Sequence, residues 1–314
     1  MGDSVTLVDP RFQAALRGGF LNIDKPTGWT STDVVRKLKG LLKVRKIGHG
    51  GTLDPVASGV LPICIGQATK FADTILLGDK EYRLTVTLGD ETDTYDSEGK
   101  VTNQQPFDTV TLGQVTDTLE SLVGTLEQVP PMFSAVRHEG RRLYELARKG
   151  IEVERKSRAV ELHAASVISF DAPNIVIDIR CSHGFYARSL AHELGRMLGT
   201  AAHLSGLVRT RSGKFNLADA RAISDIESFA RAGDWRDLLL PIDFTLDFLP
   251  RVDLDPLKAE MVRHGRQLGI AELPSIRDRL DERVRVYEDQ ELLALLRFEP
   301  SRGAWQPEKV LPPA

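Results

Sequence analysis

The most constraining feature of the chain is a short glycine-rich segment followed by a lone carboxylate. Residues 48–51 are Gly-His-Gly-Gly, a composition typical of a loop whose backbone takes positive φ or approaches another chain closely. Asp54 follows between apolar Leu53 and Pro55, and an apolar run continues to Ile65. A partly buried aspartate needs a cationic or hydrogen-bonding partner to stay ionised. By itself, however, such an aspartate is more typical of a turn or a helix cap.

The size and composition of the chain indicate a soluble protein. Its 314 residues predict about two domains, and no run of 18 apolar residues is present that would span a bilayer. Residues 1–19 lack the apolar stretch of a secretory signal. The only two cysteines, Cys64 and Cys181, form no C-x-x-C pair, which argues against disulfides and a zinc site. We therefore expect two core thiols in a cytoplasmic protein.

Charge is distributed unevenly along the sequence, although the net charge is only −3. Residues 36–46 hold six Lys or Arg and no acid, residues 137–158 hold eight against four, and residues 188–214 hold five against one. Residues 88–127 show the opposite, with nine Asp or Glu against one Lys. This segregation favours a polyanion bound across one face, with the acidic part turned away. A solvated surface without a ligand explains each basic run equally well.

Hydrophobic patterns predict strands and helices mixed along the chain, as in an α+β protein. Strands are predicted at 19–26, 82–88, 158–169 and 174–182. Helices are predicted after a cap at Ser31 or Thr32, from 69–71, and at 110–126, 143–148, 186–198, 222–232 and 235–240. We expect turns at 90–99, a linker at 241–256, a hairpin at 283–287 and 292–296, and a further strand at 305–310. The tail is thus predicted to be a small β-rich module.

Several familiar sites are absent from the sequence. It contains no G-x-x-x-x-G-K-[ST], no G-x-S-x-G and no H-E-x-x-H motif, so nucleotide hydrolysis, serine-esterase chemistry and zinc proteolysis lose support. His183, His192 and His203 are spaced so that no two share a helical face at i, i+4, which argues against a metal site.

Six segments in order resemble the bacterial tRNA pseudouridine synthases of the TruB family. They are GFLNIDKPTGWTS at 19–31, GHGGTLDP at 48–55, GQATK at 66–70, KEY at 80–82, PPMFSAVR at 130–137 and SHGFYARSL at 182–190. The resemblance covers about residues 18–215. Phe133 and Arg137 stand where the family usually has Tyr and Lys, and both replacements preserve the character of the side chain.

The resemblance implies a pseudouridine synthase fold, which is a mixed, mainly antiparallel sheet with flanking helices. It implies an N-terminal extension at 1–17, a catalytic domain at 18–245 and a small PUA-like RNA-binding domain at 250–314. The expected activity is isomerisation of uridine 55 in the T loop of tRNA to pseudouridine, without metal or organic cofactor. The expected partner is the T arm of tRNA, with no membrane and no obligatory protein partner.

The resemblance also implies roles for individual residues. Asp54 matches the family's nucleophile, and Arg188 matches the arginine that pairs with it. Tyr82 matches a ring on which the target base stacks, Tyr186 a second active-site tyrosine, and Leu207 an apolar residue of the pocket. In the absence of the family, Tyr82 and Leu207 would be interpreted as ordinary core residues.

Contacts with the remaining RNA are expected outside the pocket. A uridine in a folded T loop has to be extruded, at a cost of a few kcal/mol. His49 matches a histidine associated with the flipped bases. Arg36, Lys39 and Lys43 are candidates for contacts with backbone phosphates, which set the register of the RNA without reading its sequence.

Alternatives remain open at this stage. The same scaffold and basic face would suit an RNA chaperone that folds tRNA without chemistry, and only an enzyme requires Asp54 with Arg188. A guide-dependent pseudouridine synthase is disfavoured by the compact tail. The sequence leaves open whether Asp54 attacks C1′ or C6 of the nucleotide or removes a proton from C2′.

Overall fold

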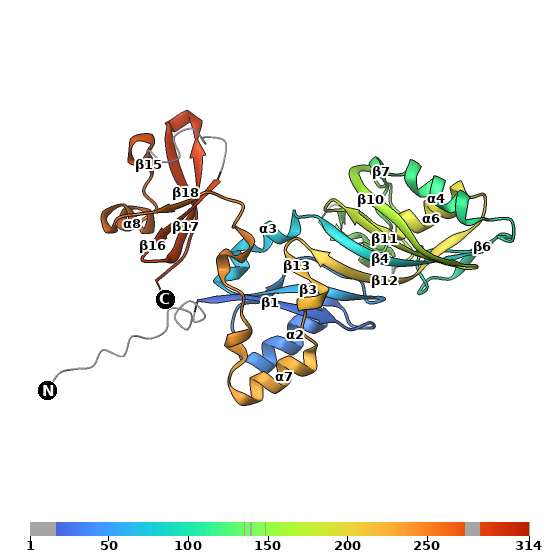
Figure 1. Cartoon of the computed structure of the whole chain (residues 1–314), viewed down its shortest axis with the longest axis horizontal. Coiled ribbons are helices and arrows are strands. Elements are labelled where there is room, and N and C mark those ends of the chain that lie inside the picture. The colour runs from blue at the N-terminus through green and yellow to red at the C-terminus, as the bar shows by residue number, and fades with distance from the viewer. Residues whose placement is uncertain (1–16, 135, 139, 148, 274–282, 314) are drawn as a thin grey trace.

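The fold is described from a computed structural model of the chain (Figure 1). The structure describes residues 17–134, 136–138, 140–147, 149–273 and 283–313. The predicted N-terminal extension lies almost entirely outside the described residues, and so do a few positions of the basic run 137–158. Among the described helices, none is long and apolar enough to span a membrane.

A nine-stranded mixed sheet forms the larger part of the molecule. Its order is β1-β3-β12-β4-β11-β10-β7, with β2 paired to β3 and β13 paired to β12. The strands are β1 (Gly18–Lys25), β2 (Ile47–His49), β3 (Ala57–Gly66), β4 (Lys80–Leu88), β7 (Gly124–Gln128), β10 (Arg158–Asp171), β11 (Asn174–Cys181), β12 (Ala202–Ser212) and β13 (Phe215–Asn216). Strands β3 and β12 pair in parallel, and the other described pairs of this sheet are antiparallel. The predicted mixed, mainly antiparallel sheet is confirmed.

Helices pack against this sheet near both of its ends (Figure 1). They are α2 (Ser31–Leu42), α3 (Ala72–Leu76), α4 (Leu112–Ser121), α5 (Leu143–Ala147), α6 (Ala187–Met197) and α7 (Ile223–Ala232), with 3-10 turns η1 (Gln67–Phe71), η2 (Leu217–Asp219), η3 (Trp235–Leu238) and η4 (Ile242–Thr245). Leu38 of α2, Leu119 of α4, Leu194 of α6 and Ile226 of α7 are all at most 1% exposed and belong to one apolar cluster with the strands. Their helical spacing is what the sequence pattern required of a buried face.

The start of α2 differs from the prediction and matters for the site. The capping residue is Thr30, which exchanges hydrogen bonds with Asp33 in a capping box. The predicted cap at Ser31 or Thr32 is therefore wrong. Ser31 is instead buried, donating from its hydroxyl to the Leu53 carbonyl at 3.0 Å and accepting from the Leu53 N–H at 2.8 Å. This pair of bonds fixes the residue directly before Asp54.

Two further elements end earlier than the sequence pattern predicted. The predicted helix 110–126 stops at Ser121 as α4, and Gly124 with φ of +123° begins the edge strand β7. A left-handed φ ends a helix and is accessible to glycine without steric cost. The predicted turn at 90–99 contains a short strand, β5 (Asp90–Thr92), which pairs with β6 (Val101–Gln104).

The β-rich C-terminal module is confirmed as a second sheet of five strands in the order β14-β16-β17-β18-β15. Its elements are β14 (Arg251–Asp253), α8 (Pro256–Arg263), β15 (Leu268–Gly269), η5 (Ile270–Glu272), β16 (Arg283–Glu288), β17 (Glu291–Glu299), η7 (Pro300–Arg302) and β18 (Ala304–Val310). Strands β16 and β17 form the predicted hairpin, and β18 is the predicted further strand. A second two-stranded pair, β8 (Arg137–His138) with β9 (Arg141–Arg142), lies in the other part of the chain.

The two sheets share apolar and ionic contacts at the segment formed by η1 and α3. Phe20 and Phe71 from the first part cluster with Tyr287 of the second, and all three are at most 2% exposed. Lys309 of β18 bonds both carboxylate oxygens of Asp73 at 2.6 and 2.7 Å. The C-terminal sheet is thus joined to the first part through a buried apolar interface and not by the linker alone.

Candidate active site

Asp54 lies on the loop that joins β2 to β3, and close packing defines the path of this loop. A Cβ atom added to Gly50 would lie 2.8 Å from Cδ1 of Ile75, so the backbone passes closer to α3 than a side chain would permit. Gly51 has φ of +144°. Leu53, held by α2 as described above, is 4% exposed. The predicted close approach and positive φ of the glycine-rich loop are both present.

Arg188, near the start of α6, reaches this loop. Its Nη2 lies 2.9 Å from Oδ2 of Asp54 and donates to the Phe133 carbonyl at 2.8 Å. The Arg188 side chain is 6% exposed, whereas that of Asp54 is 37% exposed. The guanidinium is therefore fixed in the interior, and the carboxylate retains one side open to an incoming ligand. Such charge-assisted bonds are short and directional, so they hold the carboxylate in one orientation.

A second carboxylate, Asp96, binds the other end of the same guanidinium. Its Oδ2 lies 3.3 Å from Nη1 of Arg188, and its side chain is 5% exposed. Oδ1 accepts from the Thr94 hydroxyl at 2.6 Å and from the Glu98 N–H at 3.1 Å. Asp96 comes from the turn after β5, so the sequence gave no local signal of this partnership. The arginine bridges a buried carboxylate and a half-exposed one.

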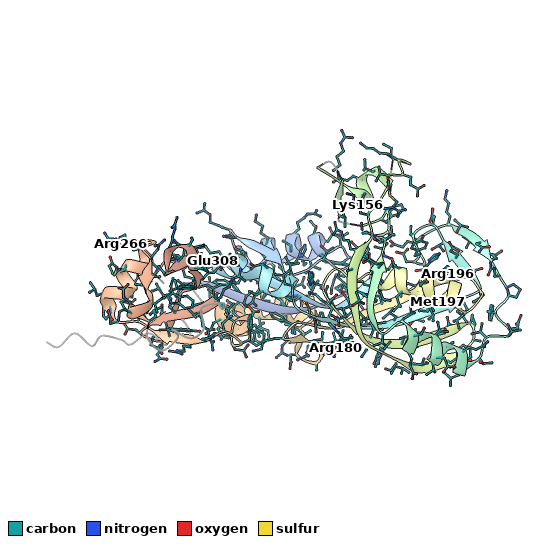
Figure 2. All side chains as sticks on the ribbon, turned by 90° about the horizontal axis from the view of Figure 1, so that it is seen from above. Lys156, Arg180, Arg196, Met197, Arg266 and Glu308 are labelled. Atoms are coloured by element: carbon teal, nitrogen blue, oxygen red, sulfur yellow. The ribbon has the colours of Figure 1, made fainter. Side chains whose placement is uncertain are left out.

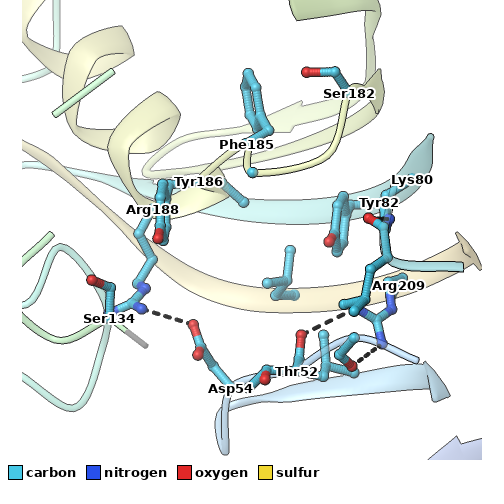
Figure 3. Close-up of a pocket in the computed structure, with 16 residues that line it drawn as sticks. Thr52, Asp54, Lys80, Tyr82, Ser134, Ser182, Phe185, Tyr186, Arg188 and Arg209 are labelled. Atoms are coloured by element: carbon cyan, nitrogen blue, oxygen red, sulfur yellow. Dashed lines mark hydrogen bonds and ion pairs between the residues drawn. The ribbon is translucent and has the colours of Figure 1, made fainter. Parts of the chain in front are cut away.

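A cavity of about 230 Å³ opens beside Asp54 (Figure 3). Its lining comes from the glycine-rich loop, the end of α3, strands β4 and β12, and the start of α6. The lining residues are Gly51, Thr52, Leu53, Asp54, Leu76, Lys80, Tyr82, Ser134, Ser182, Gly184, Phe185, Tyr186, Ala187, Arg188, Leu207 and Arg209. Five residues singled out from the sequence, namely Asp54, Tyr82, Tyr186, Arg188 and Leu207, thus surround one cavity.

The two tyrosines and the leucine make the cavity partly apolar. Burial raises the pKa of the Tyr82 phenol above its ordinary value, against an opposing effect of the nearby Arg209. Burial also raises the pKa of Tyr186, partly offset by a hydrogen bond with Ser134. Leu207 is 8% exposed and lies on β12, which pairs with β4, the strand of Tyr82. Both phenols are neutral at physiological pH and present ring surface to the cavity.

The other predicted RNA-contact residues lie outside this cavity. His49 ends β2, and its Nδ1 accepts weakly from the Gly51 N–H at 3.4 Å. Arg36, Lys39 and Lys43 are exposed along or just after α2, where Arg36 is paired with Asp33 at 2.9 Å. The structure therefore does not gather these four side chains around Asp54, and their contacts with RNA stay predictions.

The basic run 137–158 occupies a segment that projects from the main sheet. In the view from above, Lys156 stands on this projection, on the side of the molecule away from Arg180 (Figure 2). A cavity of about 320 Å³ lies in the segment, lined by Pro130, Val136, Leu143, Glu154, Arg155, Lys156 and Arg158. Its base accepts a bond from Arg155 to the Pro130 carbonyl at 3.2 Å.

Sequence reasoning missed three ionisable residues of the site. They are Asp96, which binds Arg188, and the buried cations Lys80 and Arg209, which line the cavity. Lys80 belongs to a motif quoted above, but nothing in its neighbours indicates burial. Among the described residues, no group of three His, Cys, Asp or Glu side chains is arranged to hold a metal ion.

Solved structures of similar fold cover almost the whole chain. The catalytic component of a structure described as a Cbf5-Nop10-Gar1 complex matches with a TM-score of 0.72 and 26% identity, covering 97% of this chain and 88% of that one. A chain from an H/ACA RNP bound to a substrate RNA containing 2′-deoxyuridine matches with a TM-score of 0.70 and 24% identity, covering 96% and 87%. The second likeness concerns the fold alone.

Curated relatives are more similar in sequence. The tRNA pseudouridine synthase B of Dehalococcoides mccartyi (strain CBDB1) is 40% identical over 93% of this chain and 96% of its own length. That of Moorella thermoacetica is 44% identical over 93% and 99%. The family model for the N-terminal domain of TruB family pseudouridylate synthases matches residues 39–187, and that for the tRNA pseudouridylate synthase B C-terminal domain matches 188–247.

The fold, the cavity and these matches together define an isomerase of the pseudouridine synthase class. Within that class, the chain belongs to the TruB family.

Proposed function

We propose that this protein isomerises uridine 55 in the T loop of tRNA to pseudouridine, in the cytoplasm and without metal, organic cofactor, guide RNA or protein partner. The observation that carries the proposal is the 2.9 Å pair between Arg188 and Asp54 at the wall of the cavity. A carboxylate that is oriented by a buried cation and open on one side is suited to act as a nucleophile or base. The names of the curated relatives support tRNA as the substrate.

The chemistry requires three changes in the substrate. The N1–C1′ bond breaks, the uracil rotates, and C5 bonds to C1′ while the proton on C5 is lost and N1 gains one. Asp54 either attacks C1′ or C6 or removes the proton from C2′. Arg188 keeps the Asp54 carboxylate in the orientation that the reaction needs, and Tyr82 provides a ring for the uracil to stack on. Tyr186 and Leu207 complete the walls that hold the detached base.

The target nucleotide has to leave the stacked T loop to reach Asp54. His49 adjoins the glycine-rich loop, so it is placed near the cavity entrance to occupy space vacated by flipped bases. Arg36, Lys39 and Lys43 supply exposed cations along one helix for backbone phosphates. The C-terminal sheet, as a PUA-like domain over about residues 250–314, provides a second contact with the tRNA.

The test is to incubate the purified protein with an unmodified tRNA transcript, without added cofactor, and to map pseudouridine. We expect modification at position 55 by the wild type and none by Asp54→Asn, with tRNA affinity within a few-fold of the wild type. The amide has nearly the same size but cannot act as the nucleophile or base. Asp24→Asn, on the exposed side of β1, is the matched control and should remain active.

Two outcomes would contradict the proposal. Substantial product from Asp54→Asn, after mass spectrometry has excluded reversion by deamidation, would remove Asp54 from the chemistry. Tight tRNA binding by a wild type that forms no pseudouridine would favour a chaperone that folds tRNA without chemistry. Activity that appears only on addition of a guide RNA would favour a guide-dependent enzyme.

A further inference from the structure

Two buried cations line the cavity at the end opposite to Arg188 (Figure 3). Lys80 is 6% exposed and Arg209 is 1% exposed. They lie on the paired strands β4 and β12, where Arg209 is directly opposite Tyr82 and Lys80 precedes Tyr82 by two residues. Because side chains two apart on a strand share a face, Lys80, Tyr82 and Arg209 form one continuous floor.

The ammonium of Lys80 is bound only by neutral oxygens. Its Nζ donates to the carbonyls of Ile75 at 3.0 Å, Leu76 at 2.6 Å and Gly78 at 2.5 Å. These three bonds use all three of its protons. Within the described part of the chain, no carboxylate lies within ion-pair distance of it. The carbonyls fix the position of the charge without cancelling it.

The guanidinium of Arg209 has the same kind of environment. It donates to the Val60 carbonyl at 2.7 Å and to the Thr52 and Gly51 carbonyls, each at 3.2 Å. It forms no ion pair with any carboxylate of the described residues. Burying a charge without an opposite charge is costly, and the cost recurs here at two adjacent positions of one cavity.

The cavity therefore carries an excess of positive charge. Its charged lining residues are three cations, Lys80, Arg188 and Arg209, and one carboxylate, Asp54. Of the three, Arg188 is the one that neutralises Asp54. The two other charges are held rigidly by backbone carbonyls, so no reorganisation is needed when a negative charge develops nearby. Fixed charges of this kind stabilise an anionic transition state more than the neutral ground state.

We propose that Lys80 and Arg209 form a cationic floor that stabilises negative charge on the uracil ring during isomerisation, an inference that rests on the proposed function. When the N1–C1′ bond breaks by either sugar-directed route, its electron pair stays on N1 and the uracil leaves as an anion. When Asp54 adds to C6 instead, the C5=C6 electron pair moves onto O4 as an enolate. The ring becomes anionic in all three routes, and its charge disappears when C5 bonds to C1′ and the C5 proton is lost.

The titration of Lys80 provides a test that a structural role would not satisfy. Burial, with a smaller effect of Arg209, lowers the pKa of Lys80 to about 8. The other titratable groups facing it are Asp79, Cys181 and Tyr82; the pKa of Cys181 is raised to about 12 and that of Tyr82 is raised as well. The charge of Lys80 is thus present below about pH 8 and lost above it. Because kcat/KM reports ionisations of the free enzyme, wild-type kcat/KM should fall as pH rises through about 8.

The experiment compares kcat/KM for tRNA modification from pH 6.5 to 9.5 in three variants. Lys80→Met should be slower than the wild type by about 10-fold or more at pH 7, with the alkaline fall abolished and tRNA affinity at pH 7 within a few-fold. Lys80→Arg keeps a charge that does not titrate, so its kcat/KM should stay level above pH 8. The control Lys70→Met removes a lysine that donates to the Val310 carbonyl at 2.7 Å, far from the cavity, and should retain the wild-type profile.

Three results would overturn the inference. Lys80→Met could be as fast as the wild type, or slower by one constant factor with the alkaline fall retained, as expected if Lys80 only holds the turn after α3. An alkaline fall that persists in Lys80→Arg would assign it to another group, such as Lys25, whose pKa is also about 8 because of burial. If Lys80→Met does not fold, Lys80→Arg decides alone. A wild type without activity would instead refute the proposed function.

Discussion

The division of Arg188 between two carboxylates makes Arg188→Lys the most informative substitution at the site. Arg188 uses one terminal nitrogen for Asp54 and the other for Asp96. Lysine has a single ammonium without the planar fork, so it can keep one of these partners in the original geometry and not both. Asp96 is almost completely buried, whereas Asp54 is partly open to water. We therefore expect the ammonium to remain with Asp96 and to release Asp54.

The magnitude follows from the contact that is lost. A hydrogen bond to a charged group contributes about 1.5–3 kcal/mol, which corresponds to a fall of about 10- to 150-fold in kcat if the bond orients Asp54 in the transition state. The positive charge beside Asp96 is retained, so the free energy of unfolding should fall by no more than about the same 1.5–3 kcal/mol. Arg188 lines the cavity behind Asp54, so tRNA affinity should remain within a few-fold.

Single-turnover pseudouridine formation at saturating protein, together with tRNA binding and urea denaturation, separates these quantities. Turnover by Arg188→Lys at the wild-type rate would show that the pair with Asp54 does not orient the carboxylate for reaction. An equal loss of binding and turnover would show that Arg188 acts on the RNA and not on Asp54.

Two further substitutions test other parts of the structure. Replacing Lys39 and Lys43 together by Gln should reduce the slope of log K against log[salt] for tRNA binding by up to about two phosphate equivalents of 0.7–0.9 each, with little change in turnover on bound RNA; parallel lines for both proteins would remove α2 from the RNA face. Gly59→Ala should lower the free energy of unfolding by about 2–6 kcal/mol, because Gly59 has φ of +99° and its new Cβ would lie 2.4 Å from the Arg209 carbonyl oxygen. Gly40→Ala, in α2 with open space around it, is the matched control and should be neutral or stabilising by up to about 1 kcal/mol.

The sequence predicted those parts of the fold whose signals are local. Helix α6 and strands β10 and β11 have regular apolar spacing and were placed within two residues or so of their observed bounds. Strand β12 was not predicted, because Ser205 and Gly206 interrupt its apolar pattern and Arg209 resembles a surface residue. Its burial depends on carbonyls of the glycine-rich loop about 150 residues earlier, and no local pattern encodes that contact.

The candidate site was predicted to a similar extent. The family resemblance selected Asp54 and Arg188, and the structure shows them in contact. Asp96 could not be found in this way, because its value lies in a turn that presents a buried carboxylate to α6. Carboxylates are common in the acidic stretch 88–127, so composition does not distinguish Asp96 from its neighbours.

The apolar interface between the two sheets limits how chains of this type can change during evolution. Phe20, Phe71 and Tyr287 exclude water from one another across the junction, although 267 positions of sequence separate the outermost two. A lineage that loses the C-terminal sheet by an early stop codon exposes the aromatic face of η1 and β1 in the same step. Gradual loss of the domain therefore requires polar substitutions on the first sheet before the deletion, and those substitutions weaken the intact protein while it still has both sheets.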